Sequence, residues 1–201
     1  MRHKTTSSGY TAPVRGWRYA PPARQAGVTL IELLTVSVIV VILLAIGMPS
    51  YHYVTINNRV ATESDSLLGD LQFARAEAIR EGQQVTICIS KTGTSCDQAT
   101  LPPPWQEGWI IFSNPNNVTT VDANDPLVRV DKGFSGNGDT FQSSNTTYAI
   151  NFSGNGFANL GGASMQITLH DPSANSEYTR CLEVTQSGST SVVTASTAGC
   201  T

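Results

Sequence analysis

The sequence predicts an α+β fold in which a long N-terminal helix packs on an antiparallel β-sheet domain. Three features predict it: an unbroken apolar run at residues 28–48, a helical apolar period that continues to residue 82, and short alternating segments through residues 83–201. A chain of 201 residues can bury one sizeable core and still carry an appendage. Only 13% of the residues are charged, which suits a loop-rich β domain outside the cytoplasm better than a cytosolic helical one.

Residues 28–48 are predicted to cross a membrane. They form a run of 21 residues in which Glu32 is the one charged side chain. A helix needs about 20 apolar residues to span a bilayer, and a strand of this length is not expected. A secretory signal would have a shorter apolar core followed by a small-residue cleavage site, and neither is present here.

The charges are unevenly distributed around this segment. Five of the twelve basic residues lie in residues 1–27, so the positive-inside rule places that end in the cytoplasm and the following domain outside. Residues 28–201 then hold seven basic and fifteen acidic residues, a formal net charge of −8. Such a domain repels a phosphate backbone, which makes nucleic acid an unlikely partner.

The length of the segment alone would favour an ordinary membrane anchor that is not cleaved. The charged residue Glu32 argues against that interpretation. A carboxylate inside a spanning helix costs about 2.5–3.5 kcal/mol at its centre, so it is a functional candidate by default. The small pair Ala26-Gly27 directly precedes the apolar run and would suit a protease.

The stretch RQAGVTLIELL at residues 24–34 resembles the type IV prepilin cleavage motif. The resemblance implies that a prepilin peptidase cuts between Gly27 and Val28 on the cytoplasmic side and that Val28 becomes N-methylated. Glu32 would then be the fifth mature residue, and Pro49 would be the twenty-second, where the family commonly has a helix-kinking proline. The first mature residue is usually Phe in this family, whereas here it is Val28.

Charge pairing gives this motif a physical purpose. Removal of residues 1–27 creates a cationic chain end at the edge of the apolar phase, and Glu32 of a neighbouring subunit can pair with it. Two costly charges then offset each other as the subunit leaves the membrane, and the pairing sets the stagger between subunits. We therefore predict that Glu32 is a subunit-assembly residue.

Residues 49–82 are predicted to continue the helix outside the membrane as an amphipathic half that ends at Gly82. The expected apolar stripe consists of Val60, Leu67, Leu68, Leu71, Ala74, Ala78 and Ile79. The charged residues expected mostly on the other face are Glu63, Asp65, Asp70, Glu77, Arg80 and Glu81.

Residues 83–201 are predicted to form one β-rich domain with a single antiparallel sheet. The expected strands are 85–90, 109–112, 127–130, 147–152, 165–170 and 178–185, with a weaker one near residue 192. Turn signals occur at Asn137-Gly138 and Asn155-Gly156.

A second resemblance covers most of this domain. The block WQEGWIIF at residues 105–112, the loop and strand at residues 122–129, and the segments at residues 151–154 and 181–184 are similar to the GspH/FimT family of minor pilins and pseudopilins. This implies a type IV pilin-like fold and a structural, non-enzymatic subunit of a type IV pilus or a type II secretion pseudopilus. It also implies location in the bacterial inner membrane with a periplasmic domain, and partnership with other pilin subunits and an assembly platform.

DNA uptake is the alternative that the FimT branch implies. Relatives of that branch bind DNA through a basic Gly-Arg-x-Arg segment near the C-terminus. The matching stretch here is Gly188-Ser189-Thr190-Ser191, in which both arginines are absent. Together with the net charge of −8, this disfavours DNA binding.

Four cysteines, at positions 88, 96, 181 and 200, read as two disulfides in an oxidising compartment. A bridge between Cys88 and Cys96 would close a short loop, and one between Cys181 and Cys200 would tether the C-terminal tail. Three pairings are possible from sequence alone. A zinc site is disfavoured because the spacing is wrong and no histidine cluster is nearby.

No metal, cofactor or catalytic residue is predicted. The candidate calcium ligands are Asp122, Asn124, Asp125 and Asp131, but they lack EF-hand spacing and read better as solvated turn residues. His52 and His170 have no recognisable nucleophile or carboxylate partner, which argues against an enzyme. Trp105 and Trp109 are expected in the core rather than on a sugar- or partner-binding platform.

Overall fold

A computed structural model describes residues 27–98, 103–116, 121, 125–134, 138–144, 146–195 and 200. The chain divides into two compact units, residues 1–45 and 46–201. Helix α1, Leu30–Glu81, contributes residues to both of them.

In the second unit, one face of α1 is buried against the sheets. Val60, Leu67, Leu71, Ala74 and Ala78 are all fully buried, as the three- and four-residue spacing predicts. Gly82 ends the helix in the left-handed conformation, with φ of +67°, and its N–H donates to the carbonyl of Ala78 at 2.9 Å. This is the predicted glycine C-cap.

Three members of the predicted helix pattern lie elsewhere. Ile79 is 52% exposed, although it was assigned to the apolar stripe. Glu63 and Asp70 are buried, although they were assigned mostly to the solvent face. They come three residues after Val60 and Leu67, and side chains three apart share a helix face, so the buried face is wider than the apolar stripe alone.

The β-rich domain contains two antiparallel sheets rather than the single sheet that the sequence predicted. The five-stranded sheet has the order β3-β2-β1-β5-β6. Its strands are β1 Val85–Ile89, β2 Trp109–Ser113, β3 Leu127–Asp131, β5 Ala149–Phe152 and β6 Ala158–Asn159. A short 3-10 helix, η1 Trp105–Glu107, precedes β2.

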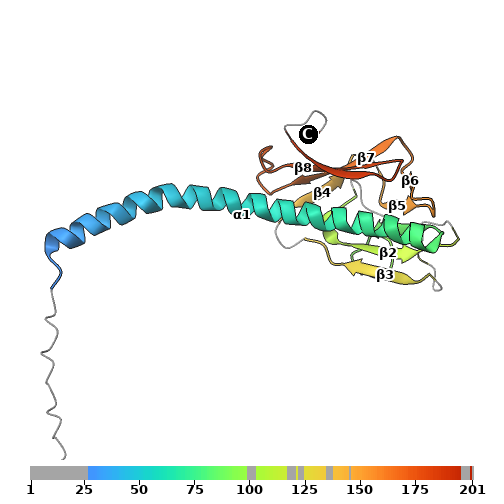
Figure 1. Cartoon of the computed structure of the whole chain (residues 1–201), viewed down its shortest axis with the longest axis horizontal. Helices are drawn as coiled ribbons and strands as arrows, with labels where there is room; N and C mark the ends of the chain where they lie inside the picture. The colour runs from blue at the N-terminus through green and yellow to red at the C-terminus, as the bar shows by residue number, and fades with distance from the viewer. Residues whose placement is uncertain are drawn as a thin grey trace, which may run out of the picture. The chain divides into compact units, whose positions relative to one another are not determined.

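The four-stranded sheet has the order β4-β7-β8-β9. Its strands are β4 Thr140–Ser143, β7 Ser164–His170, β8 Arg180–Thr185 and β9 Thr190–Thr194. The sequence analysis missed β4 and β6, which are four and two residues long and carry little alternation. Figure 1 shows β2 and β3 on one side of α1, and β7 and β8 on the other.

One hydrophobic core joins the buried face of α1 to both sheets. Trp105 and Trp109 are fully buried in it, which confirms the core assignment of both tryptophans. A second, smaller cluster on the opposite face of the five-stranded sheet contains Cys88, Ile110, Phe112 and Ala149. Every residue of β2 is therefore buried, which explains why its sequence is a continuous apolar run instead of an alternating one.

Arg75 of α1 holds together two turns that belong to different sheets. Its Nε donates to the carbonyl of Gly156, after β5, and its guanidinium also donates to the carbonyl of Ser187, after β8, at 3.0 and 3.1 Å. Gly188 has φ of +74°, and a Cβ added there would overlap the carbonyl oxygen of Gly156 and the Arg75 side chain. The junction therefore requires glycine at position 188.

We expect Gly188→Ala to lower the free energy of unfolding by about 1–3 kcal/mol, because the new Cβ meets backbone and the left-handed conformation is strained. The measurement is denaturant unfolding of the full chain in detergent, followed by tryptophan fluorescence. Gly69→Ala is the matched control, since Gly69 lies in α1 with nothing within 4 Å of its Cβ position. An unchanged unfolding midpoint for Gly188→Ala would contradict the packing described here.

Candidate functional site

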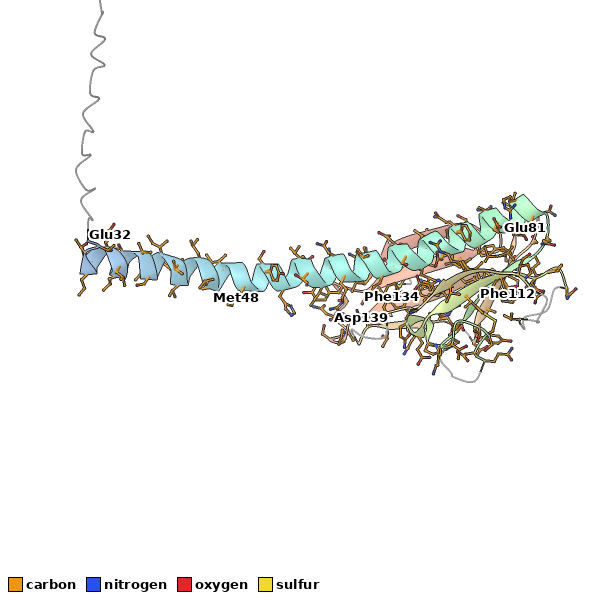
Figure 2. All side chains as sticks on the ribbon, turned by 90° about the horizontal axis from the view of Figure 1, so that it is seen from below. Glu32, Met48, Glu81, Phe112, Phe134 and Asp139 are labelled. Atoms are coloured by element: carbon orange, nitrogen blue, oxygen red, sulfur yellow. A yellow bond between two sulfur atoms is a disulfide. The ribbon has the colours of Figure 1, made fainter. Side chains whose placement is uncertain are left out.

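The apolar segment of α1 is exposed in the part of the chain that the structure describes. Every residue from Val28 to Met48 is exposed, and Figure 2 shows the side chains of Glu32 and Met48 projecting from the helix into open space. Among the described residues, α1 is the one helix whose length and composition would allow it to cross a membrane, with a mean hydropathy of 2.8 in its most apolar window. None of that window is buried, so this part of α1 is not a core helix.

The helix begins just after the predicted cleavage point. Gly27, Val28 and Thr29 are not helical, and nothing lies within 4 Å of the Cβ position of Gly27. The backbone between Gly27 and Val28 is therefore exposed and outside the helix.

Thr29 caps the helix, a role that the sequence analysis missed. Its side-chain oxygen accepts the N–H of Glu32 at 3.3 Å, and its carbonyl accepts the N–H of Leu33 at 3.1 Å. The signal was present, because Thr-x-x-Glu before an apolar run is the capping-box pattern. Glu32 lies in the first helical turn, where a carboxylate interacts favourably with the helix dipole.

Helix α1 continues through Pro49 without ending there. Proline has no N–H, so the carbonyl of the residue four positions earlier loses its usual donor at this point. The helix kink at Pro49 stays a prediction.

Asp70 ties α1 to the five-stranded sheet. Its Oδ2 accepts the indole N–H of Trp109 on β2 at 2.7 Å, and its Oδ1 pairs with the guanidinium of Arg129 on β3 at the same distance. Arg129 also lies over the ring of Phe73, 5.3 Å from the ring centroid. Burial raises the pKa of Asp70, while the bond from Trp109 and the charge of Arg129 oppose that rise. These contacts explain why an acidic residue is tolerated on the buried face of α1.

The structure contains two disulfides, Cys88–Cys96 and Cys181–Cys200, each with Cα atoms 5.6 Å apart. These are the two bridges considered from the sequence, which by itself allows three pairings. The first holds the loop after β1 against the smaller hydrophobic cluster. The second fixes residue 200 to β8. Each can add about 2–4 kcal/mol by restricting the unfolded chain.

The other candidate residues do not form a site in the described part of the chain. Asp122 and Asn124 lie outside the described residues, and Asp131 uses its Oδ1 to accept the N–H of Gly133 at 2.8 Å. Among the described residues, no group of three His, Cys, Asp or Glu side chains has a geometry that could hold a metal ion. His52 is exposed, and Nδ1 of His170 contacts the Thr179 hydroxyl at 3.0 Å.

Most of the basic side chains in residues 28–201 are engaged within the molecule. Six of the seven make an ion pair or a hydrogen bond within the chain: Arg59 with Asp139, Arg75 with two carbonyls, Arg80 with Glu77 and Glu81, Lys91 with Glu107, Arg129 with Asp70, and Arg180 with Asn57. The segment Gly188–Ser191 leads into β9, includes the first two residues of that strand, and carries no charge. The described surface therefore offers no concentrated cationic patch.

Comparison with known proteins gives two family matches. The family described as "Type II transport protein GspH" matches residues 63–188, and the "Prokaryotic N-terminal methylation motif" matches residues 22–48. No curated protein matches significantly.

The fold is similar to that of a solved minor pilin. Two crystal structures of the type IV minor pilin FimU of Pseudomonas aeruginosa match at 19% identity. One has a TM-score of 0.54 and covers 70% of this chain and 92% of FimU. The other has a TM-score of 0.51 and covers 68% and 94%. The predicted α+β, type IV pilin-like fold is thereby confirmed.

We expect Asp70→Ala to lower the free energy of unfolding by about 1–3 kcal/mol, because it leaves the buried indole N–H of Trp109 without an acceptor. Asp65→Ala is the control, since Asp65 is an exposed acid on the same helix. Denaturant unfolding of both variants in detergent provides the comparison. Equal effects of the two substitutions would show that Asp70 does not anchor α1 to the sheet.

Proposed function

Because the chain belongs to the GspH family of type II transport proteins, we propose that it is a structural minor pilin or pseudopilin, cleaved after Gly27, methylated at Val28 and assembled into a fibre. The observation that carries this proposal is the match of residues 22–48 to the methylation motif, together with an apolar helix whose side chains are exposed from Leu30 to Met48 in the described structure. A segment of this kind needs lipid or partner helices around it.

Glu32 has the position that an assembly contact requires. It lies four positions after Val28, in the first turn of α1, so its carboxylate is close in sequence to the proposed new chain end. Capping of α1 uses the backbone N–H of Glu32 and the side chain of Thr29, so it does not occupy the Glu32 carboxylate. That carboxylate is free to accept a hydrogen bond from the terminal amine of a neighbouring subunit, which would offset the cost of both charges in an apolar surrounding.

The proposed location is the bacterial inner membrane, with residues 28–48 spanning it and the β domain in the periplasm. Both disulfides suit that oxidising compartment. The prepilin peptidase, other pilin-like subunits and the assembly platform are the proposed partners. The same subunit properties serve a type IV pilus and a type II secretion pseudopilus. DNA binding receives no support from the described surface, because six of the seven basic side chains in residues 28–201 are already engaged within the chain.

N-terminal mass spectrometry of the membrane-extracted protein tests the processing step. We expect a chain that begins at Val28 and carries one methyl group when the peptidase is present, and an unprocessed chain when the peptidase is deleted. Gly27→Leu is expected to abolish cleavage, because a bulky side chain replaces the small residue before the cut. A functional fibre subunit that still retains residues 1–27 would overturn the proposal.

Substitution of Glu32 tests the assembly step. Glu32→Gln is expected to be cleaved and methylated normally but to enter fibres at least about tenfold less than wild type, since a buried charge partner is lost. Ser37→Ala is the control, because the Ser37 hydroxyl bonds only the carbonyl of Leu34 within the same segment. If the Glu32→Gln variant enters fibres as well as the wild type does, Glu32 does not act by charge pairing between subunits.

A further inference from the structure

Three tyrosines gather where α1 leaves its apolar segment. Tyr51 and Tyr53 lie on α1 within about 8 Å along the helix from Met48, the last residue of that segment. The ring of Tyr178, from the loop between β7 and β8 at residues 171–179, lies 5.5 Å from the ring of Tyr53. Tyr51 is 74% exposed and Tyr53 is 46% exposed. Met48 and the β domain belong to the same compact unit, so this grouping lies within one unit.

The loop between β7 and β8 is exposed but closely built. The Asp171 carboxylate accepts the hydroxyl of Ser173 at 2.6 Å and the backbone N–H of Asn175 at 3.3 Å. The N–H of Tyr178 donates to the carbonyl of Asn175 at 3.0 Å. Ala174 has φ of +50°, which is a strained conformation for a residue other than glycine. These bonds give the loop a defined surface and fix the place of Tyr178.

Two polar contacts tie this end of the β domain to α1. The guanidinium of Arg180, at the start of β8, donates to the side-chain oxygen of Asn57. Arg59 pairs with Asp139, which directly precedes β4, at 2.7 Å. Figure 2 shows the part of α1 that runs from Met48 to the level of Asp139. Tyr178 is therefore held against α1 just after the end of the apolar segment.

Two open hollows adjoin the pair formed by Tyr53 and Tyr178. One has a volume of about 500 Å³, and His52, Ile56 and Tyr178 are among the residues that line it. The other has a volume of about 470 Å³ and is lined in part by Tyr53 and Glu177. Both hollows combine polar and apolar side chains. Such a surface suits the headgroup layer of a bilayer, where tyrosine is enriched because its ring is apolar and its hydroxyl is polar.

The charges of this surface do not favour an anionic partner. Among the described residues here, the cations Arg59 and Arg180 are engaged by Asp139 and Asn57. Glu177 is an exposed acid in the loop. Anionic lipids are bound by clusters of basic side chains, and these residues do not form one. The headgroups that fit this surface are therefore zwitterionic, and the tyrosine rings supply the attraction.

We propose that the loop between β7 and β8, together with Tyr53, binds the headgroup layer of zwitterionic phospholipids while the subunit is unassembled. The inference rests on the proposed membrane anchor at residues 28–48. Lipid is favoured over a partner subunit because Tyr51 and Tyr53 directly follow a segment that lipid must cover before assembly. The contact holds the β domain in one orientation on the membrane, and entry into a fibre releases it.

Fluorescence quenching of Tyr178→Trp in phosphatidylcholine liposomes tests the contact, with the signal of the parent protein subtracted. A nitroxide on the headgroup is expected to quench the new tryptophan at least about twofold more than one near the end of an acyl chain. Phe157→Trp is the matched control, because Phe157 is a 60% exposed aromatic residue. It follows Gly156, whose Cβ position is 2.8 Å from Ile79, about 40 Å along α1 from Tyr53. We expect neither nitroxide to quench the control.

A second reporter and a change of lipid sharpen the test. Ser176→Trp places a tryptophan on the same exposed loop and leaves the contact between Tyr53 and Tyr178 unchanged. It should be quenched by the headgroup nitroxide as Tyr178→Trp is, and absence of quenching at both positions would overturn the proposal. Addition of phosphatidylglycerol should change neither signal. Quenching that appears only with this anionic lipid would show that charge makes the contact and would contradict the proposal.

A tryptophan in the anchor separates this inference from the proposed function. Leu44→Trp is expected to be quenched by the acyl-chain nitroxide. If it is quenched and Tyr178→Trp is quenched by neither nitroxide, the headgroup contact is wrong and the anchor stands. If Tyr178→Trp is shielded from aqueous iodide only in fibres, a partner subunit covers this surface instead of lipid. If Leu44→Trp is not quenched, residues 28–48 do not span the bilayer and the proposed function fails as well.

Discussion

An apolar helix segment that is exposed among the described residues is the constraint behind the rest of this structure. Residues 28–48 expose every side chain, and at about 25 cal/mol for each Å² of apolar surface such a segment is not stable in water. Lipid can cover it before assembly, and partner helices can cover it afterwards. Neither lipid nor apolar helices can hydrate the Glu32 carboxylate. The free energy of this group therefore depends strongly on what surrounds the helix. The proposed cleavage after Gly27 would supply a cation at the place where that cost can be offset.

The second half of α1, in contrast, is buried on one face and packs against the β domain. Its buried face reaches both sheets, and Asp70 and Arg75 extend that face with directed polar contacts. Asp70 joins β2 and β3 to the helix, and Arg75 joins the turns after β5 and β8. With the two disulfides added, the domain is fixed to α1 by contacts that do not rely on hydrophobic packing alone.

The sequence was most informative where one physical signal dominated. The length of the apolar run, the spacing of Val60 to Ala78 and the cap at Gly82 predicted α1 closely, and the tryptophans were correctly placed in the core. The division into two sheets could not be read from the chain, because it depends on long-range pairing of short strands such as β4. The burial of Glu63 and Asp70 was also missed, since only the fold brings Trp109 and Arg129 to Asp70. The Thr-x-x-Glu pattern at Thr29 also predicts the N-cap of α1, but the analysis of the apolar run did not consider it.

The electrostatic role of Glu32 can be measured between copies in an assembled fibre. Mixed fibres would contain one set of subunits with a ¹⁵N-labelled Val28 amine and another with a ¹³C-labelled Glu32 carboxyl group, and solid-state NMR would detect nitrogen–carbon contacts between them. The account predicts an intermolecular contact at hydrogen-bonding range, with the carboxylate ionised. Absence of any contact between the two labels in well-formed fibres would show that Glu32 serves α1 alone, through its place in the first helical turn.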